Sequence, residues 1–167
     1  MKNIRYKYFF DTPTSLSDKN LQKIIQFYLI ECPVEGKSHR GLKFKDYGYV
    51  GASSFSKLRK NLLATSSRSL KKNYFPSKKD ELIENFKKTE SIHFPEEYCV
   101  FLKSDENSVI RSMFSAIRNA FAHGSFNVKS YEKQKIYYFS NFDKYQKAKI
   151  VLKEETLLSW IKIFKNK

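Results

Sequence analysis

Three side chains near residue 120 are of types that could cleave RNA together. Arg118, Asn119 and His123 fall within the segment RNAFAHG, residues 118–124. An imidazole accepts or donates a proton near neutral pH, and a guanidinium grips two phosphate oxygens while it stays charged. An amide such as that of Asn119 can orient either group. RNA supplies its own nucleophile, the 2′-hydroxyl, so these three residues are candidate catalytic residues.

The reaction that these groups could perform needs no metal ion. Attack by the 2′-hydroxyl would leave a 2′,3′-cyclic phosphate on one product and a 5′-hydroxyl on the other. The sequence offers no clustered carboxylates that would hold a metal ion. We therefore predict a metal-independent endoribonuclease without a cofactor.

A long helix is expected to position the three candidate residues. Apolar residues recur at the helical period through this segment and predict a helix over 107–123. They are Ile110, Phe114, Ile117 and Phe121. Gly124 is placed to end the helix in a left-handed conformation, because it has no Cβ. A neighbouring stripe carries small and then polar residues, and small side chains let a second helix approach closely. Arg118 and His123 are five residues apart, so an ideal helix sets them to either side of one another.

The run RNAFAHG resembles the R-N-x-x-x-H signature of the HEPN superfamily, whose members are helical-bundle ribonucleases and nucleotide binders. The longer run IRNAFAHGSF is similar to branches that carry R-N-A-x-A-H-G. In catalytic members the arginine and the histidine of two protomers meet at a dimer interface and cut RNA without a metal. The resemblance therefore implies a homodimer and the catalytic roles of Arg118, Asn119 and His123. It also implies a toxin or an antiviral-defence effector. It covers the chain from about Tyr98 to the end.

The charge of the chain favours a polyanionic partner. It has 32 Lys and Arg against 17 Asp and Glu, which gives a formal net charge of +15, and such a charge suits RNA, DNA or an acidic protein. The segment 65–79 interleaves basic, hydroxyl and aromatic side chains and is predicted to be a phosphate-contacting loop. The predicted RNA-binding residues are Arg68, Lys71, Lys72, Tyr74, Arg111 and Lys129. The alternative for this loop is a mobile surface segment, and the alternative for the charge is a lysine-rich surface with no binding role.

The periodicity predicts one mainly α domain over residues 1–167, a HEPN-like antiparallel helical bundle. Helices are expected over 18–31 with Ser17 as N-cap, from Ser54 onward, near 79–90, from Pro95 to Leu102, and over the last 14 residues, 154–167. Long basic loops are expected near 33–53 and 65–79. After Gly124 the period changes to two, so a small β-hairpin or meander is predicted near 126–152, between the last two helices. The final helix is expected to pack against the helix that carries Arg118.

The remaining sequence features exclude several classes of protein. Cys32 and Cys99 are isolated, so neither a disulfide framework nor a zinc site is expected. No run is long and apolar enough for a membrane span, and the N-terminus lacks the features of a signal peptide. A cytoplasmic location is the default expectation. Two alternatives to a nuclease stay open. The first is a non-catalytic module that binds RNA or a nucleotide, and the second is an interaction protein whose basic face binds an acidic partner such as an antitoxin.

Overall fold

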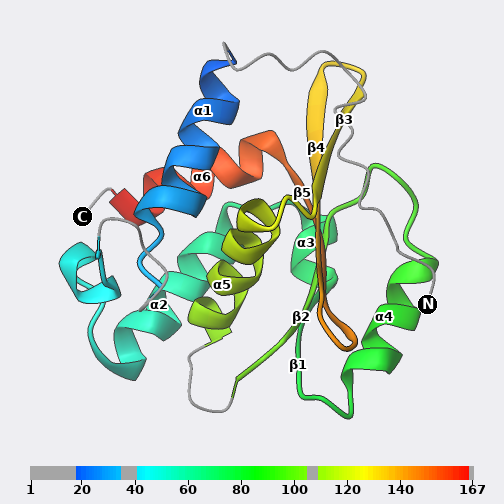
Figure 1. Cartoon of the computed structure of the whole chain (residues 1–167), viewed down its shortest axis with the longest axis horizontal. Helices are drawn as coiled ribbons and strands as arrows, with labels where there is room; N and C mark the ends of the chain where they lie inside the picture. The colour runs from blue at the N-terminus through cyan, green and yellow to red at the C-terminus, as the bar shows by residue number, and fades with distance from the viewer. Residues whose placement is uncertain (1–17, 35–40, 105–108, 166–167) are drawn as a thin grey trace.

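The computed structural model describes residues 18–34, 41–104 and 109–165. The chain is a mixed α/β protein built around a five-stranded sheet (Figure 1), so the expectation of a mainly helical bundle is wrong. Its strands are β1 (Tyr74–Ser77), β2 (Tyr98–Leu102), β3 (Phe126–Tyr131), β4 (Gln134–Phe142) and β5 (Gln146–Lys153). Its helices are α1 (Lys19–Ile25), the π-helical η1 (Gln26–Glu31), the 3-10 helix η2 (Phe44–Tyr47), α2 (Gly51–Ala64), α3 (Arg68–Lys72), α4 (Leu82–Glu90), α5 (Val109–Ala122) and α6 (Glu154–Lys165).

The sheet has the strand order β1-β2-β5-β4-β3. Strands β3, β4 and β5 form an antiparallel meander, which occupies the position between the last two helices where a β segment was expected. The sheet extends further than this meander because β5 also pairs with β2, and β2 pairs in parallel with β1. Parallel neighbours need a crossover connection, and here α4 provides it between β1 and β2.

Two strands, β1 and β2, lie in segments where the sequence predicted a loop and a helix. The helix predicted from Pro95 to Leu102 is wrong, because 98–102 is the buried strand β2. Its sequence YCVFL is a short apolar run, and such a run suits a strand covered on both faces as well as a helix. The predicted loop at 65–79 instead contains α3 and β1. The predicted loop at 33–53 contains η2 and the first residues of α2, and residues 35–40 lie outside the described residues.

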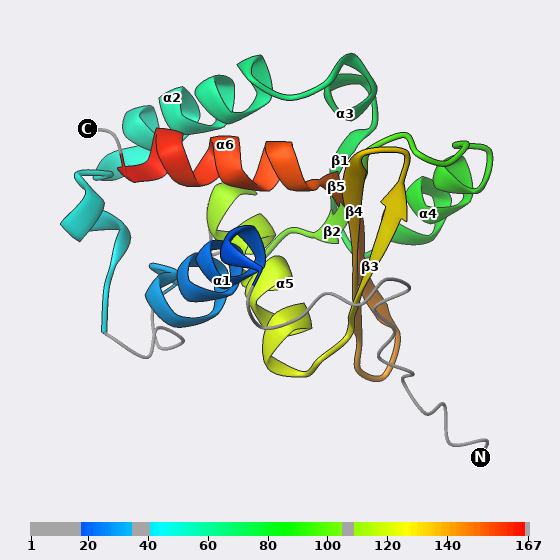
Figure 2. The same ribbon diagram turned by 90° about the horizontal axis from the view of Figure 1, so that it is seen from above.

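One face of the sheet carries most of the helices. Figure 2 shows α1, α2, α5 and α6 on one side of the strands and α4 on the other. Phenylalanines from η1, α5 and α6 meet in the main core: the Phe27 ring centroid lies 6.1 Å from that of Phe114 and 5.4 Å from that of Phe164. On the second face a smaller cluster of Leu82, Phe86 and Val100 seats α4.

The last helix packs as its sequence pattern predicted. The ring of Phe164 lies 5.3 Å from that of Phe114, so α6 does contact α5. Its Trp160 is fully buried and donates hydrogen bonds of 3.1 Å from Nε1 to the Leu62 carbonyl and to the Ser66 hydroxyl. These contacts place α6 against α2, and the Phe164 ring joins it to α5.

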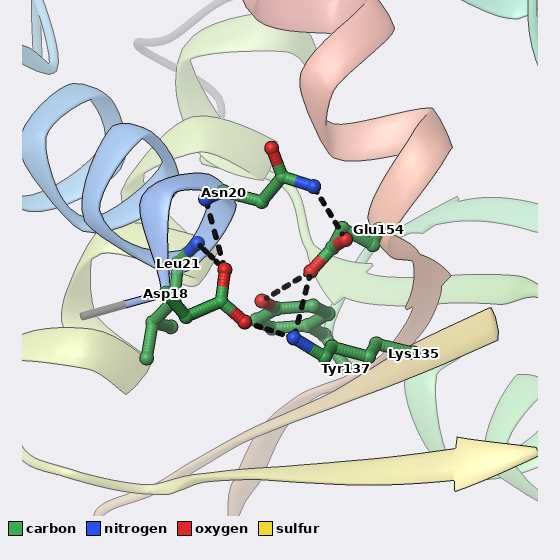
Figure 3. Close-up of polar contacts among 6 residues, drawn as sticks. All are labelled: Asp18, Asn20, Leu21, Lys135, Tyr137 and Glu154. Atoms are coloured by element: carbon green, nitrogen blue, oxygen red, sulfur yellow. Dashed lines mark hydrogen bonds and ion pairs between the residues drawn. The ribbon is translucent and has the colours of Figure 1, made fainter. Parts of the chain in front are cut away.

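A polar cluster ties the first described helix to the sheet and to α6 (Figure 3). Asp18 is the N-cap of α1 and accepts from the backbone amides of Asn20 and Leu21; Ser17, the expected cap, lies outside the described residues. Asp18 also forms an ion pair with Lys135 of β4. Glu154 accepts from Asn20 at 2.8 Å and from the Tyr137 hydroxyl at 3.1 Å. Burial is the largest cause that raises the pKa of Tyr137, and the neighbouring carboxylate of Glu154 raises it further.

The start of α2 also differs from the sequence-based expectation. Val50 occupies the N-cap position of α2, and no side chain caps it. Ser54, which was expected to cap this helix, lies inside the first turn. Its hydroxyl donates back to the carbonyls of Val50 and Gly51. The described helices include none that is both long and apolar enough to cross a membrane.

Candidate nucleic-acid interface

The end of α5 has the geometry that its sequence predicted. Gly124 adopts a left-handed φ of +61°, which favours glycine. The Ser125 amide donates to the Ala120 carbonyl at 2.7 Å, and the Gly124 amide donates to that of Phe121 at 3.1 Å. These two bonds form a Schellman motif, which satisfies the last carbonyls of the helix. His123 is therefore held at a defined helix end, immediately before the chain turns into β3.

Arg118 lies on a different side of this helix end from Asn119 and His123, which are four residues apart and share one face. His123 is exposed, whereas Arg118 and Asn119 are half-buried. The Nε atom of Arg118 is enclosed and has no hydrogen-bond partner among the described residues. Five residues correspond to about 140° of rotation around a helix, so one chain does not place Arg118 and His123 on a common face. Arg118 and Asn119 are consecutive residues of the helix, and His123 is exposed one turn after Asn119.

Asn119 faces a small cavity between α5 and the sheet. This cavity has a volume of about 280 Å³ and is lined by Ser112, Ser115 and Asn119 of α5, and by Asn141 and Lys147 of the meander, among others. The Asn141 side chain donates to the Ala116 carbonyl at 2.7 Å and ties the sheet to the helix there. The side of α5 with small residues is thus only partly covered, and polar side chains line the open part.

Arg111 lies near the other end of α5, in a second cavity of about 340 Å³. Its guanidinium carbon sits 4.8 Å from the ring centroid of Phe55 and 5.6 Å from that of Phe44. Lys43 and Lys45 line the same cavity. Aromatic contacts hold the guanidinium in place. The described residues that line the cavity include three basic side chains and no acid, so the cavity is cationic and suits a phosphate. The start of α5 and η2 build this site from segments that are about 65 residues apart in the sequence.

The predicted basic segment contributes to a third depression, of about 730 Å³. Arg68 and Lys72 of α3 line it. Lys71 is exposed on the same helix but does not line it. The sequence did not identify two further basic residues at its wall, Lys88 of α4 and His93 of the following loop. They reach Arg68 and Lys72 only because the β1–α4–β2 crossover folds back past α3, and a helical pattern at 82–90 alone does not show this.

Tyr74 does not have the accessible ring that base stacking needs. Its hydroxyl is buried, and its ring lies 5.7 Å from that of Phe101 in the core. Arg59 covers it at 5.3 Å. Burial raises the pKa of Tyr74, which is a further sign of its packed surroundings. Tyr74 therefore has packing contacts with the core, and its predicted part in RNA binding stays a prediction.

Lys129 lies beside aromatic residues that the sequence did not single out. It is exposed on β3, and its Nζ sits 5.6 Å from the ring centroid of Tyr138. Phe94 is 46% exposed and lies 5.0 Å from Tyr131 and 6.3 Å from Tyr138, measured between ring centroids. Alternation along β3 and β4 puts Lys129, Tyr131 and Tyr138 on the face opposite α5. The period-two pattern could have shown this face, but the contact with Phe94 could not be foreseen.

Comparison with known proteins gives no relative: no family model, no curated protein and no solved structure matches this chain. In the part of the chain that the structure describes, no group of three or more His, Cys, Asp or Glu side chains is arranged to hold a metal ion.

Proposed function

We propose that this protein is a metal-independent endoribonuclease that acts as a homodimer. The observation that carries the proposal is the exposed His123 at the fixed end of α5, with Arg118 and Asn119 in the preceding turn. The net charge of +15 supports a polyanionic substrate. We further propose that it is a cytoplasmic toxin or antiviral-defence effector and that it cuts cellular or phage RNA.

The proposed reaction is an internal transfer at one phosphodiester. His123 takes the proton of the 2′-hydroxyl as its oxygen attacks the adjacent phosphorus. The bond from phosphorus to the 5′-oxygen breaks, and that oxygen takes up a proton from a second acid. Arg118 binds the phosphate oxygens on which negative charge grows. The products are a 2′,3′-cyclic phosphate and a 5′-hydroxyl, and no atom is needed beyond those of the RNA and the shuttled protons.

A second copy of the chain would bring an arginine and a histidine together at one site. Within one chain Arg118 and His123 are rotated away from each other, but twofold pairing along α5 would set the arginine of one copy beside the histidine of the other. The exposed Ala122 and the partly covered Ser115 are small enough for close approach of two such helices. The proton for the 5′-oxygen would then come from water that enters the shared site, so each site needs one arginine and one histidine.

RNA cleavage in the presence of EDTA tests this proposal. Total RNA and tRNA are incubated with the wild type, with His123→Ala and with Asn61→Ala, a substitution at an exposed position on α2 that is distant in sequence from the motif. We expect wild type and Asn61→Ala to release 2′,3′-cyclic phosphate ends and His123→Ala to release none. Equal cleavage by His123→Ala, or no cleavage by the wild type, contradicts the proposal.

A second candidate function is RNA binding without cleavage. It is favoured by one observation: the basic depressions around Arg111 and around Arg68 lie away from His123 and would bind phosphate whether or not two copies pair. This alternative requires salt-dependent RNA binding that persists in His123→Ala, with intact RNA recovered from wild type.

A further inference from the structure

The face of the sheet opposite α5 combines exposed aromatic rings with a basic depression. Phe94 and Tyr131 are 46% and 38% exposed, and their rings meet edge to face at 5.0 Å. Large aromatic residues are mostly buried in a soluble protein, so two that touch at the surface call for an explanation. Tyr138 supports Phe94 from the sheet, at 6.3 Å and an interplanar angle of 15°. Together Phe94, Tyr131 and Tyr138 form what we term the aromatic platform.

The aromatic platform adjoins the depression of Arg68, Lys72, Lys88 and His93, because His93 and Phe94 are consecutive residues. Among the residues that line this depression, Glu96 is the single acid. Lys88 forms an ion pair of 3.1 Å with the exposed Glu84. No ion pair within the described ranges joins Arg68 or Lys72 to an acid, so their charge remains available. Lys129 adds a further cation to this face, beside the Tyr138 ring.

We propose that this face binds single-stranded RNA, with unpaired bases on Phe94 and Tyr131 and phosphates in the adjoining basic depression. Aromatic rings next to a cationic groove are the two parts that single-strand binding requires, because every base has a face that stacks and every nucleotide carries a phosphate. In a duplex the bases are stacked on each other and cannot reach the rings. The choice of RNA over other single strands rests on the proposed function; the stacking argument itself is independent of cleavage.

The location of the platform gives it a role distinct from catalysis. It lies on the face opposite α5, so a strand bound here would be held apart from His123. The aromatic platform of one protein copy could then hold one part of an RNA chain while another part of the same RNA is cut at His123. Recognition of unpaired RNA and cleavage would reside on opposite faces of the sheet.

Binding of an RNA that cannot be cleaved tests the platform alone. The probe is a fluorescein-labelled oligouridine of about 12 nucleotides with 2′-O-methyl riboses, a length within the range that such surfaces cover. The methyl group blocks 2′-hydroxyl attack, so cleavage does not enter the measurement. We expect Phe94→Ala and Tyr131→Ala each to raise the Kd about tenfold, as the loss of one stacked base does. Tyr131→Phe keeps the ring and should keep the affinity.

Matched variants distinguish RNA binding at this surface from binding that depends only on the overall positive charge. Phe142→Ala removes an exposed ring at the end of β4, and Lys87→Ala removes an exposed lysine of α4 that does not line the depression. Both should bind as wild type does, whereas Lys72→Ala should weaken binding and flatten its salt dependence. Duplex RNA of the same length should bind Phe94→Ala and wild type equally.

The outcomes distinguish this inference from the proposed nuclease. Unchanged affinity of both Phe94→Ala and Tyr131→Ala, with circular dichroism showing that they are folded, overturns the platform even if the wild type cleaves RNA. Wild-type protein that fails to bind the probe also overturns it. Platform-dependent binding by a protein that never cleaves RNA supports the inference and contradicts the nuclease proposal.

Discussion

Lys135 of β4 forms an ion pair with Asp18, the residue that caps α1. The hydrogen bond that Lys135 donates to Asp18 in this ion pair is the largest cause that lowers the pKa of Asp18 below its ordinary 3.8. The backbone amides of Leu21 and Asn20 act in the same direction, and burial acts against them. A carboxyl whose pKa is lower in the folded protein stabilises the fold above its unfolded pKa. That contribution is lost as the pH falls from about 3.8 through the folded pKa. Acid should therefore loosen the contact between α1 and the sheet.

Substitutions at Asp18 test this linkage. We expect urea unfolding at pH 6 and at about pH 2.5, above and below the ordinary aspartate pKa of 3.8, to show a smaller loss of stability in acid for Asp18→Asn than for wild type. Asp18→Ala also removes the cap and should cost about 1 kcal/mol at neutral pH. Asp80→Asn, at an exposed position before α4, is the control. A pH profile of Asp18→Asn that equals that of wild type contradicts this account.

A side chain at Gly124 should strain the end of α5. Its φ of +61° costs a residue with a Cβ about 1–2 kcal/mol, so Gly124→Ala should lower the unfolding free energy by that amount in urea. The same substitution should reduce RNA cleavage beyond the loss of stability, because His123 precedes the strained residue. Gly124→Asn should be milder, since asparagine tolerates this conformation. Equal stability of Gly124→Ala and wild type would show that the turn relaxes without cost.

Mixing two inactive variants tests whether the site is shared between copies. Arg118→Ala and His123→Ala should each abolish cleavage alone. Mixed after partial unfolding and refolding, they should regain roughly a quarter to a half of the activity, because a heterodimer retains one site with both groups. Analytical ultracentrifugation gives the fraction of dimer, and Ala122→Glu should lower it by placing like charges at the exposed position. Activity in a strict monomer would rule out the shared site.

Substitution of Arg111 separates its charge from its planar shape. Its guanidinium rests against Phe44 and Phe55 in a cationic cavity. Arg111→Lys keeps the charge but loses the stacked plane, so we expect weaker RNA binding with a nearly unchanged salt slope. Arg111→Leu should also reduce that slope by about one. Fluorescence anisotropy at several salt concentrations measures both, and Lys57→Leu on the exposed side of α2 is the control.

Local sequence patterns predicted the elements whose partners lie close in the chain. The helical period set α5 and its end at Gly124, and the acids first and lysines last predicted α6. The change to a period of two predicted a β segment after Gly124, and β3, β4 and β5 pair with one another in sequence order.

The parts that the sequence misjudged depend on distant pairing. The segment 98–102 was expected to be helical because Pro95, Glu96 and Glu97 suit a first turn, yet it pairs with β5, about 50 residues later. Buried Glu97 accepts from the Lys153 amide at 2.8 Å and so belongs to the sheet. The site shows the same limit: the motif at 118–123 was visible, whereas the approach of Lys88, His93 and Phe94 to earlier and later segments was not.

Pro76 gives the sheet one closed border. The carbonyls of Asn73 and Ser77 accept from the amides of Cys99 and Lys103, so alternation turns the nitrogen of Pro76 toward the outer side of β1. A proline there has no amide hydrogen to offer, and an incoming strand would find a gap in the ladder. Growth of the sheet into fibrils is therefore obstructed at β1.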